Sequence, residues 1–259
     1  MNKRNLLAHF HTKAVAIASV FALLLSPVST LPTLAGWEEN KVTPYELAEA
    51  ELPENFYVLY RIVERIARAN DLDQHPWRIV INSEYDINAY ATDANVIGIF
   101  NGLLDQLVGD SSALACVVAH EMAHHLHRHV AITDAELTKG LEQITESAPA
   151  QQEEQMAQLQ KRIGQLRRSQ ELEADASGYK YAVQAGFEPE GCLRGLDLLS
   201  RLPGSGYSSD THPSASERIV AIQALIVKNP PEWLVTLGRQ RLRSTEPLTY
   251  YWSADEQWL

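Results

Sequence analysis

The sequence predicts an α+β fold that is mainly helical, with a small β-sheet beside one buried, histidine-rich helix. Apolar side chains repeat at helical spacing through most of residues 43–228, and the period changes to two only between residues 77 and 100. Five of the nine histidines of the chain crowd into the otherwise apolar stretch 113–130. With 259 residues, of which 45% are hydrophobic, the chain can bury one sizeable core or at most two small ones.

The first 35 residues differ from the rest of the chain. Three basic residues accompany the apolar run "AVAIASVFALLL", which is short for a membrane span but typical of the central region of a signal peptide. Thr33-Leu34-Ala35 offers a cleavage site before Gly36. We therefore interpret residues 1–35 as the signal peptide of an exported protein. The periplasm is the favoured destination. An uncleaved anchor, and a lumenal or secreted destination, stay open as alternatives.

Charge and cysteine content narrow the classes of partner. The net charge is −11, and removal of the three basic residues of the leader makes it about −14. Such an acidic chain argues against nucleic acid and against simple electrostatic binding to anionic lipid. Two cysteines exclude a disulfide-built scaffold. The sequence favours a buried free thiol at Cys116, although a bridge to Cys192 is compatible with an oxidising compartment.

The N-terminal half is expected to place a helix, three strands and a second helix in order. A capping box from Thr43 to Glu46 starts the first helix, which Asn70-Asp71 ends. Strands are expected over residues 77–82, 88–92 and 95–100, and Asn101-Gly102 is expected to close the sheet. Residues 110–112 then supply helix-capping side chains for the histidine-rich helix.

The C-terminal half is expected to be helical. Residues 133–168 are polar and rich in Glu and Gln, and they predict two amphipathic helices that we interpret as a helical insert or lid, with a plain packed pair as the equal alternative. The second of these helices continues to Gly186. A shorter helix over 190–202 and a capped helix from Ser214 to Pro230 follow. We assign one catalytic domain to residues 36–228 and leave the tail, residues 229–259, unassigned.

Within the histidine-rich helix, His120-Glu121-Met122-Ala123-His124 fits the pattern H-E-x-x-H. Residues four apart share a helix face, so His120 and His124 can bind one zinc ion while Glu121 lies beside them as a general base. A buried histidine and glutamate are costly unless they are paired or bind a metal. The alternative is a set of hydrogen-bonded core histidines.

A third ligand is expected from the segment "ELEAD". Glu171 and Asp175 are again four residues apart, which suits one carboxylate that binds the metal and a second one that orients a ligating imidazole. Glu173 lies on another face and is expected to be solvated. His125, His127 and His129 follow the motif; they fit a solvated helix end, with a second metal site as the less favoured interpretation.

Several ordered motifs over about residues 55–225 resemble one family. Besides H-E-x-x-H, four segments are similar to motifs of the zinc metalloprotease family of the CAAX prenyl proteases and HtpX, and most of all to its soluble exported members of the BepA and LoiP kind. They are "NAYATDANVIGIFNGLL" before the histidine-rich helix, and "RSQELEAD", "AGFEPEG" and "THPSASERI" after it. The resemblance implies a zincin-type (gluzincin) domain. It also implies one catalytic zinc ion held by His120, His124 and Glu171, with Glu121 as the base.

The same resemblance implies supporting roles for further residues. Asp175, Arg168 and Arg218 would surround the ligands, and His212 would either stabilise the oxyanion or cap the zinc in a resting state. Residues 88–91, which are Asn88, Ala89, Tyr90 and Ala91, would form the edge strand that pairs with a peptide substrate.

The function implied is a zinc-dependent endopeptidase that cleaves unfolded or misassembled exported proteins, with peripheral contact to membrane proteins as a further expectation and the oligomeric state left open. A chaperone-like binding module with a capped or structural zinc ion is the alternative. An intact Glu121 speaks against this alternative, because a structural site needs no general base.

Overall fold

The computed structural model describes residues 42–202, 213–253 and 258–259. The expected leader, residues 1–35, and His212 lie outside these ranges. Among the helices described, none combines the length and the apolar character needed to cross a membrane.

Two helices open the described chain where the sequence predicts one. Helix α1 (Pro44–Glu51) begins with the expected capping box at Thr43, and α2 (Glu54–Ala69) ends at the expected position. The break falls at Leu52, whose backbone is extended because the ring of Pro53 disfavours a helical conformation in the preceding residue. The sequence expectation of one continuous helix is therefore wrong at this point.

The small sheet has three strands, β1 (Arg78–Asn82), β2 (Ala89–Ala91) and β3 (Val96–Phe100), in the order β1-β3-β2. Strand β1 runs parallel to β3, and β2 runs antiparallel to it. Helix α3 (Asn101–Gln106) follows β3 directly, where the sequence predicts only a closing turn.

The outer edge of β1 is paired by the end of the chain. The amide N of Ile79 donates to the carbonyl O of Leu259 at 2.7 Å, and the amide N of Leu259 donates back at 2.9 Å. Val80 forms an isolated antiparallel bridge with Trp258. Within the described part of the chain, the outer edge of β2 has no such strand partner.

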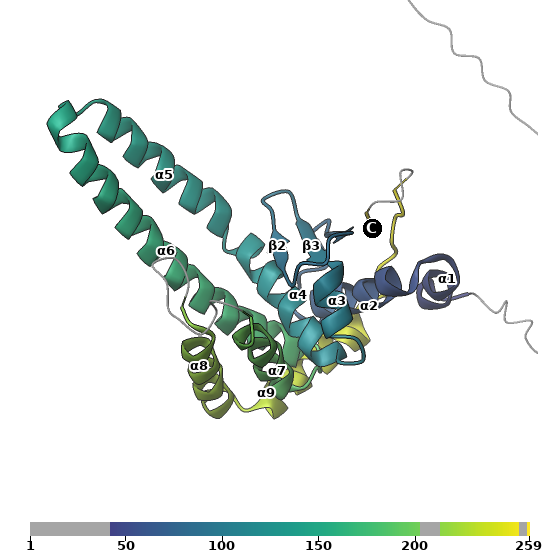
Figure 1. Cartoon of the computed structure of the whole chain (residues 1–259). Coiled ribbons are helices and arrows are strands. Elements are labelled where there is room, and N and C mark those ends of the chain that lie inside the picture. The colour runs from purple at the N-terminus through teal and green to yellow at the C-terminus, as the bar shows by residue number, and fades with distance from the viewer. Residues whose placement is uncertain (1–41, 203–212, 254–257) are drawn as a thin grey trace, which may run out of the picture. The chain divides into compact units, whose positions relative to one another are not determined.

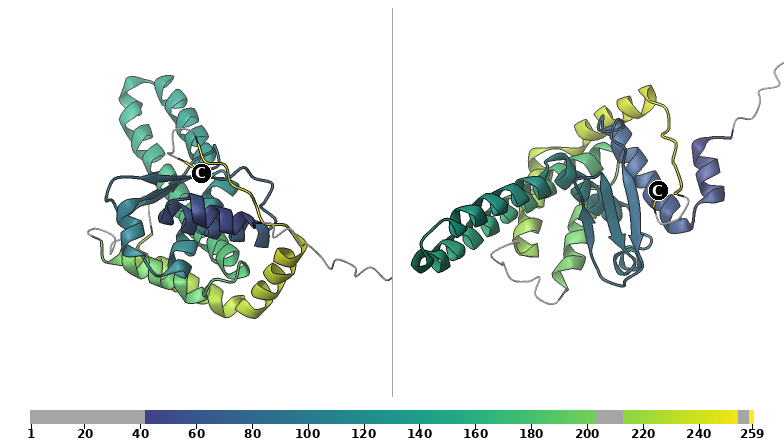
Figure 2. Two further views of the ribbon diagram at one scale, coloured as in Figure 1. Left: turned by 90° about the vertical axis from the view of Figure 1, so that its right-hand side faces the viewer. Right: turned by 90° about the horizontal axis from the view of Figure 1, so that it is seen from above.

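The histidine-rich helix α4 (Ser111–Leu126) forms the centre of the core. It begins at Asp110, whose side chain accepts a hydrogen bond from the amide of Ala113, as predicted. Most side chains of its middle turns are apolar and buried, and these turns lie between the sheet with α2 on one side and α6 with α7 on the other (Figure 2). The buried residues of this stretch are Ala115, Val118, Ala119, Met122 and Ala123.

Helices α5 (His129–Thr145) and α6 (Pro149–Gln184) form a long antiparallel hairpin that projects from the core (Figure 1). Ile144, Leu159 and Ile163 form a small apolar cluster of their own between the two helices. Both helices lie where the sequence predicts them, with the break at residues 146–148. The role of the hairpin as a lid stays a prediction.

The remaining helices are α7 (Pro189–Ser200), α8 (Ala215–Lys228) and α9 (Pro231–Ser244). The capping box that starts α8 at Ser214 is present as predicted. Helix α9 lies in the tail that the sequence left unassigned, and it packs on α2 and α6. The buried guanidinium of Arg68 on α2 donates to the carbonyl groups of Leu242 and Thr245, which fixes the chain after α9.

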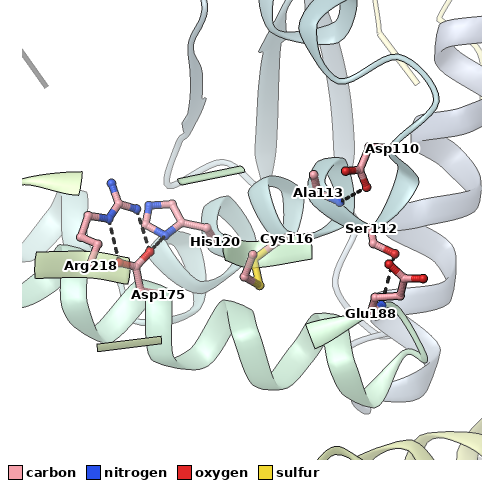
Figure 3. Close-up of a disulfide and its surroundings, with 9 residues drawn as sticks. Asp110, Ser112, Ala113, Cys116, His120, Asp175, Glu188 and Arg218 are labelled. Atoms are coloured by element: carbon pink, nitrogen blue, oxygen red, sulfur yellow. Dashed lines mark hydrogen bonds and ion pairs between the residues drawn. A yellow bond between two sulfur atoms is a disulfide. The ribbon is translucent and has the colours of Figure 1, made fainter. Parts of the chain in front are cut away.

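A disulfide joins the central helix to α7. Cys116 on α4 and Cys192 on α7 are bonded, with their Cα atoms 5.2 Å apart (Figure 3). Of the two alternatives that the sequence leaves open at Cys116, the structure has the bridge and not the favoured free thiol. Cys116 lies one helical turn before His120. The bond therefore anchors α7 to α4 close to the histidines.

Helix α6 approaches α4 most closely at Gly178. A Cβ atom built on Gly178 would lie 2.8 Å from the amide N of His120 and 2.9 Å from its Cα. Both atoms belong to backbone in the buried core, so neither can move aside cheaply. Glycine at this position allows the two helices to touch at the histidine.

We predict that Gly178→Ala destabilises the protein by about 1–3 kcal/mol, because the added methyl group forces α6 away from α4. Gly195→Ala is the matched control, since its new methyl group would meet nothing closer than the carbonyl O of Ala113 at 3.8 Å. Urea unfolding of both variants checks the prediction. Equal stability of the two variants would contradict the proposed close packing.

Candidate metal centre

Two helices bring the expected metal ligands together. His120 and His124 lie on one face of α4, and their Nε2 atoms are 3.0 Å apart. Glu171 on α6 faces them, with one carboxylate oxygen 3.6 Å from Nε2 of His120 and the other 3.5 Å from Nε2 of His124. The three ligand atoms lie within 4.8 Å of one another, so they could bind one ion.

A buried carboxylate holds the first histidine. Oδ1 of Asp175, one turn after Glu171 on α6, lies 3.0 Å from Nδ1 of His120 (Figure 3). The carboxylate favours the proton on Nδ1, and this leaves the lone pair of Nε2 pointing toward Glu171 and His124.

Arg218 of α8 pairs with two carboxylates of α6, those of Glu171 and Asp175. Its guanidinium donates twice to Asp175, through Nε and Nη2, each at 2.7 Å (Figure 3). Its Nη1 lies 3.3 Å from Oε2 of Glu171. Two carboxylates in a largely buried site would repel each other without this charge, and the hydrogen bonds from Arg218 help to keep Asp175 ionised.

The protonation states follow from burial and these contacts. Burial acts to raise the pKa of Asp175, but hydrogen bonds from Arg218 and His120 outweigh it, so the pKa is well below the usual range. Burial and the neighbouring His120 lower the pKa of His124 to about 2, so its imidazole is neutral. For His120, burial acts to lower the pKa, but Asp175 outweighs it and the net shift is upward.

Among the described residues, Glu121 makes no ion pair, whereas Glu171 is paired with Arg218. Its side chain is buried beside His120, and burial raises its pKa to about 7, with a further contribution from the negative charge of Glu171. A carboxyl group with a pKa near neutrality can both accept and return a proton at the pH of the cell. This behaviour suits a general base.

The donor set fits zinc. Two neutral imidazole nitrogens and one carboxylate are common ligands of catalytic zinc, which leaves a further position for water or substrate. Ligand atoms around a tetrahedral zinc ion are separated by about 3.3 Å, because each bond measures about 2.0–2.1 Å. The separations of 3.0, 3.5 and 3.6 Å found here need little adjustment to match that geometry.

The expected substrate strand lines the same cavity. A cavity of about 360 Å³ contains both histidines, Glu121 and Glu171, and residues 88–91 of the β2 region form one of its walls. Nδ1 of His125 lies 2.9 Å from the carbonyl O of Thr92, which ties the end of this strand to α4.

The hydrogen bonds of β2 define which of its groups are free. The carbonyl of Asn88 accepts from the amide of Phe100, and the amide of Thr92 donates to the carbonyl of Val96. In an antiparallel pair, every second residue directs its backbone N–H and C=O groups toward the partner strand. The backbone groups of Ala89 and Ala91 therefore point away from β3.

The other expected site residues are placed less directly. Arg168 is linked to the metal ligands through α8. Its Nη2 donates to Oε1 of Glu217 at 3.2 Å, and Glu217 precedes Arg218 on that helix. His212 lies outside the described residues.

The structure also brings together a second group of side chains, which the sequence did not favour as a site. The expected solvated helix end is wrong for His129, which is only 3% exposed, and its Nδ1 lies 3.0 Å from Nδ1 of His124. Its Nε2 lies 3.3 Å from Glu173, the residue predicted to be merely solvated. The spacing of His129 five residues after His124 was the available signal. The left-handed backbone of Arg128, which turns His129 inward, has no clear sequence signature.

An H-E-x-x-H helix facing a helix-borne glutamate, in a mainly helical fold with a small sheet, defines a zincin-type metallopeptidase domain. The comparison with known families agrees: the model of peptidase family M48 matches residues 53–226, and the chain belongs to this family. The expected resemblance and the expected fold class are thereby confirmed.

Curated relatives are similar over part of their length. The metalloprotease LoiP of Escherichia coli K12 is 26% identical over 163 residues, which cover 59% of this chain and 64% of LoiP. Two mitochondrial metalloendopeptidases OMA1 are each 28% identical. The one from Arabidopsis thaliana matches 59% of this chain and 32% of its own length, and the one from Schizosaccharomyces pombe matches 70% and 53%. The chain thus spans between about a third and just under two thirds of these relatives.

We predict that Glu121→Gln alters the pH dependence of stability of the metal-free protein. A carboxyl whose pKa rises on folding from 4.5 to about 7 stabilises the fold below pH 4.5, and this contribution is lost as the pH rises through 7. Relative to wild type, Glu121→Gln should therefore become more stable by about 2–3 kcal/mol between pH 5 and pH 8.

Urea unfolding in the presence of a chelator measures this difference, with the exposed Glu142→Gln as the matched control. Parallel profiles for Glu121→Gln and wild type would show that Glu121 is ionised throughout and that its burial does not raise its pKa.

Proposed function

We propose that this protein is a zinc-dependent endopeptidase with Glu121 as its general base. The observation that carries the proposal is the position of Glu121: a buried carboxyl group with a pKa near 7, next to His120, in the cavity that also holds His124 and Glu171. A structural zinc site would have no use for such a group.

His120, His124 and Glu171 would hold the zinc ion, which when bound polarises a scissile carbonyl group and makes a water molecule more acidic. Glu121 accepts the proton of the attacking water and then returns it to the leaving amine. Asp175 keeps His120 in the tautomer that presents Nε2 to the ion, and Arg218 keeps Asp175 ionised. For His212, the expected role in supporting the oxyanion or capping the zinc remains part of the proposal.

An extended peptide is the substrate conformation that fits the cavity wall. Ala89 and Ala91 offer backbone groups at the outer edge of β2, and an extended chain could pair with them as an added strand. Such pairing recognises backbone more than side chains, so it suits segments that are unfolded. We propose unfolded or misassembled exported proteins as substrates, with membrane proteins as partners at their periphery.

Two observations support export. The basic and apolar leader over residues 1–35 is typical of a signal peptide, and the Cys116–Cys192 disulfide is stable in an oxidising compartment such as the periplasm. The alternative function, a chaperone-like binding module, would need the zinc but not Glu121.

We predict that the wild-type protein cleaves casein and that both Glu121→Gln and a zinc chelator reduce the rate at least 100-fold, because either change removes a component that the attack on the peptide bond requires. The protein is purified from the exported fraction of cells that express the full chain. Its recovery there with Gly36 as the first residue tests the export proposal in the same preparation.

In the same assay, His212→Ala separates the two roles proposed for that residue: a faster variant indicates a resting-state cap, and a slower one indicates oxyanion support. If zinc is bound but wild type and variants are equally inactive, the binding-module alternative replaces the endopeptidase proposal.

We predict that Ala91→Pro lowers kcat/KM for an extended peptide about fivefold, because proline removes one backbone donor at the free edge of β2 and one hydrogen bond is worth about 1 kcal/mol. The N–H of Ala91 points away from β3, so the ladder between β2 and β3 keeps its bonds. Ala91→Val, which retains the N–H in a strand-forming residue, is the matched control. Equal losses in both variants would mean that the edge of β2 does not pair with the substrate.

A further inference from the structure

A second group of potential metal ligands lies at the junction of α4 and α5, outside the catalytic ligand set. Oε1 of Glu173 is 3.7 Å from Nδ1 of His127, and Oε2 is 3.3 Å from Nε2 of His129. The three ligand atoms all lie within 4.8 Å of one another. These separations are close to the roughly 3.3 Å expected between ligands of a tetrahedral zinc ion.

We propose that His127, His129 and Glu173 form a second zinc-type metal site, and that an ion bound there weakens the hold of the catalytic site on its own zinc ion through His129.

The backbone at Arg128 creates this arrangement. Residues two apart on a continuous helix point in nearly opposite directions, so His127 and His129 could not share one ion there. Arg128 adopts a left-handed conformation with φ 57°, and it ends α4 before α5 begins at His129. The two imidazole rings consequently stack, with their planes 16° apart and their centroids separated by 5.4 Å. A left-handed arginine is strained, and such strain is commonly kept at functional positions.

Both imidazoles already have a partner on the nitrogen that faces away from Glu173. Nε2 of His127 lies 2.9 Å from Oγ of Ser177 on α6, so a proton on that nitrogen leaves Nδ1 free to bind a metal. Nδ1 of His129 lies 3.0 Å from Nδ1 of His124. Partners of this kind fix the orientation of ligating histidines in metal sites.

The site is open to solvent on one side. Glu173 is 56% exposed and His127 is 32% exposed, whereas His129 is buried. An ion could therefore enter from solvent and keep one or more water ligands. Imidazole and carboxylate donors suit zinc and neighbouring divalent metals better than calcium or magnesium.

The two metal sites are coupled because the Nδ1 atoms of His124 and His129 share one hydrogen bond, which holds a single proton. A metal on Nε2 of His124 leaves the proton of that ring on Nδ1, where it is donated to Nδ1 of His129. A metal on Nε2 of His129 likewise leaves the proton of His129 on its own Nδ1. With both sites occupied, two N–H groups would face each other across 3.0 Å, so each ion should weaken the binding of the other.

Equilibrium dialysis against zinc tests the stoichiometry, with the full chain in a Glu121→Gln background to prevent self-cleavage. This protein should bind two zinc ions, and added His127→Ala or Glu173→Gln should each remove the weaker one. His125→Ala is the matched control: His125 is a neighbouring histidine of the same run, but it contacts Thr92 and lies outside this group. It should retain both ions. Circular dichroism confirms folding of each variant.

The coupling is tested by removal of the catalytic site without a change at His129. In a His120→Ala variant, the remaining zinc ion should bind the second site at least fivefold more tightly than it does when the catalytic site is filled, a typical size for such coupling. His127→Ala added to this variant should then abolish zinc binding.

Two results would overturn the proposal. Binding of a single ion that His127→Ala leaves in place would mean that Glu173 and the histidines form only an ion-pair network. A lower affinity for the first ion in Glu173→Gln, with no second ion in wild type, would mean that Glu173 and His129 only orient His124. Failure of the catalytic site itself would look different, since wild type would then bind one ion and His127→Ala none.

Discussion

The contact between α4 and α6 at His120 determines the geometry of the whole site. Gly178 lets the two helices touch at the backbone of this histidine, and Glu171 and Asp175 precede Gly178 by about two turns and one turn of the same helix. Because α6 is a single unbroken helix here, the depth of this one contact fixes both carboxylates relative to the imidazoles. The ligand positions are thus determined by helix packing, before any ion is considered.

Arg218 makes that packing energetically possible. The carboxylates of Glu171 and Asp175 on α6 lie against two imidazoles of the largely apolar helix α4. An unpaired charge in this buried place would cost much free energy. A guanidinium that bonds Asp175 with two donors and lies beside Glu171 offsets this cost, and it also ties α8 to α6. Glu121 has no such partner, and its raised pKa is the consequence. The same burial that destabilises the ionised glutamate therefore produces its proposed role as a base.

Local sequence patterns predicted most of this arrangement. Contacts between segments far apart in the sequence could not be predicted in this way. The H-E-x-x-H spacing, the Glu171–Asp175 pair and the capping boxes at Thr43 and Ser214 each depend on residues within one or two turns, so the sequence displays them directly. The bond of Cys116 to a residue 76 positions away, and the pairing of Leu259 with Ile79, depend on how distant segments meet. The inward turn of His129 depends on a left-handed arginine, a conformation that the residue type disfavours.

The two edges of the sheet are used differently, and this difference bears on how an extended substrate could bind. An unpaired strand edge invites pairing with any extended chain, which is a hazard as well as an opportunity. Residues 258–259 cover the edge of β1, whereas β2 is left without a strand partner among the described residues. Strand β2 is only three residues long, and His125 ties its end to the helix that carries His120 and His124. The open edge is therefore short, and it lies in the wall of the cavity that holds the metal ligands. A chain paired there would lie along the wall of the cavity that contains Glu121, whereas the edge of β1 is already paired at Ile79 and Val80.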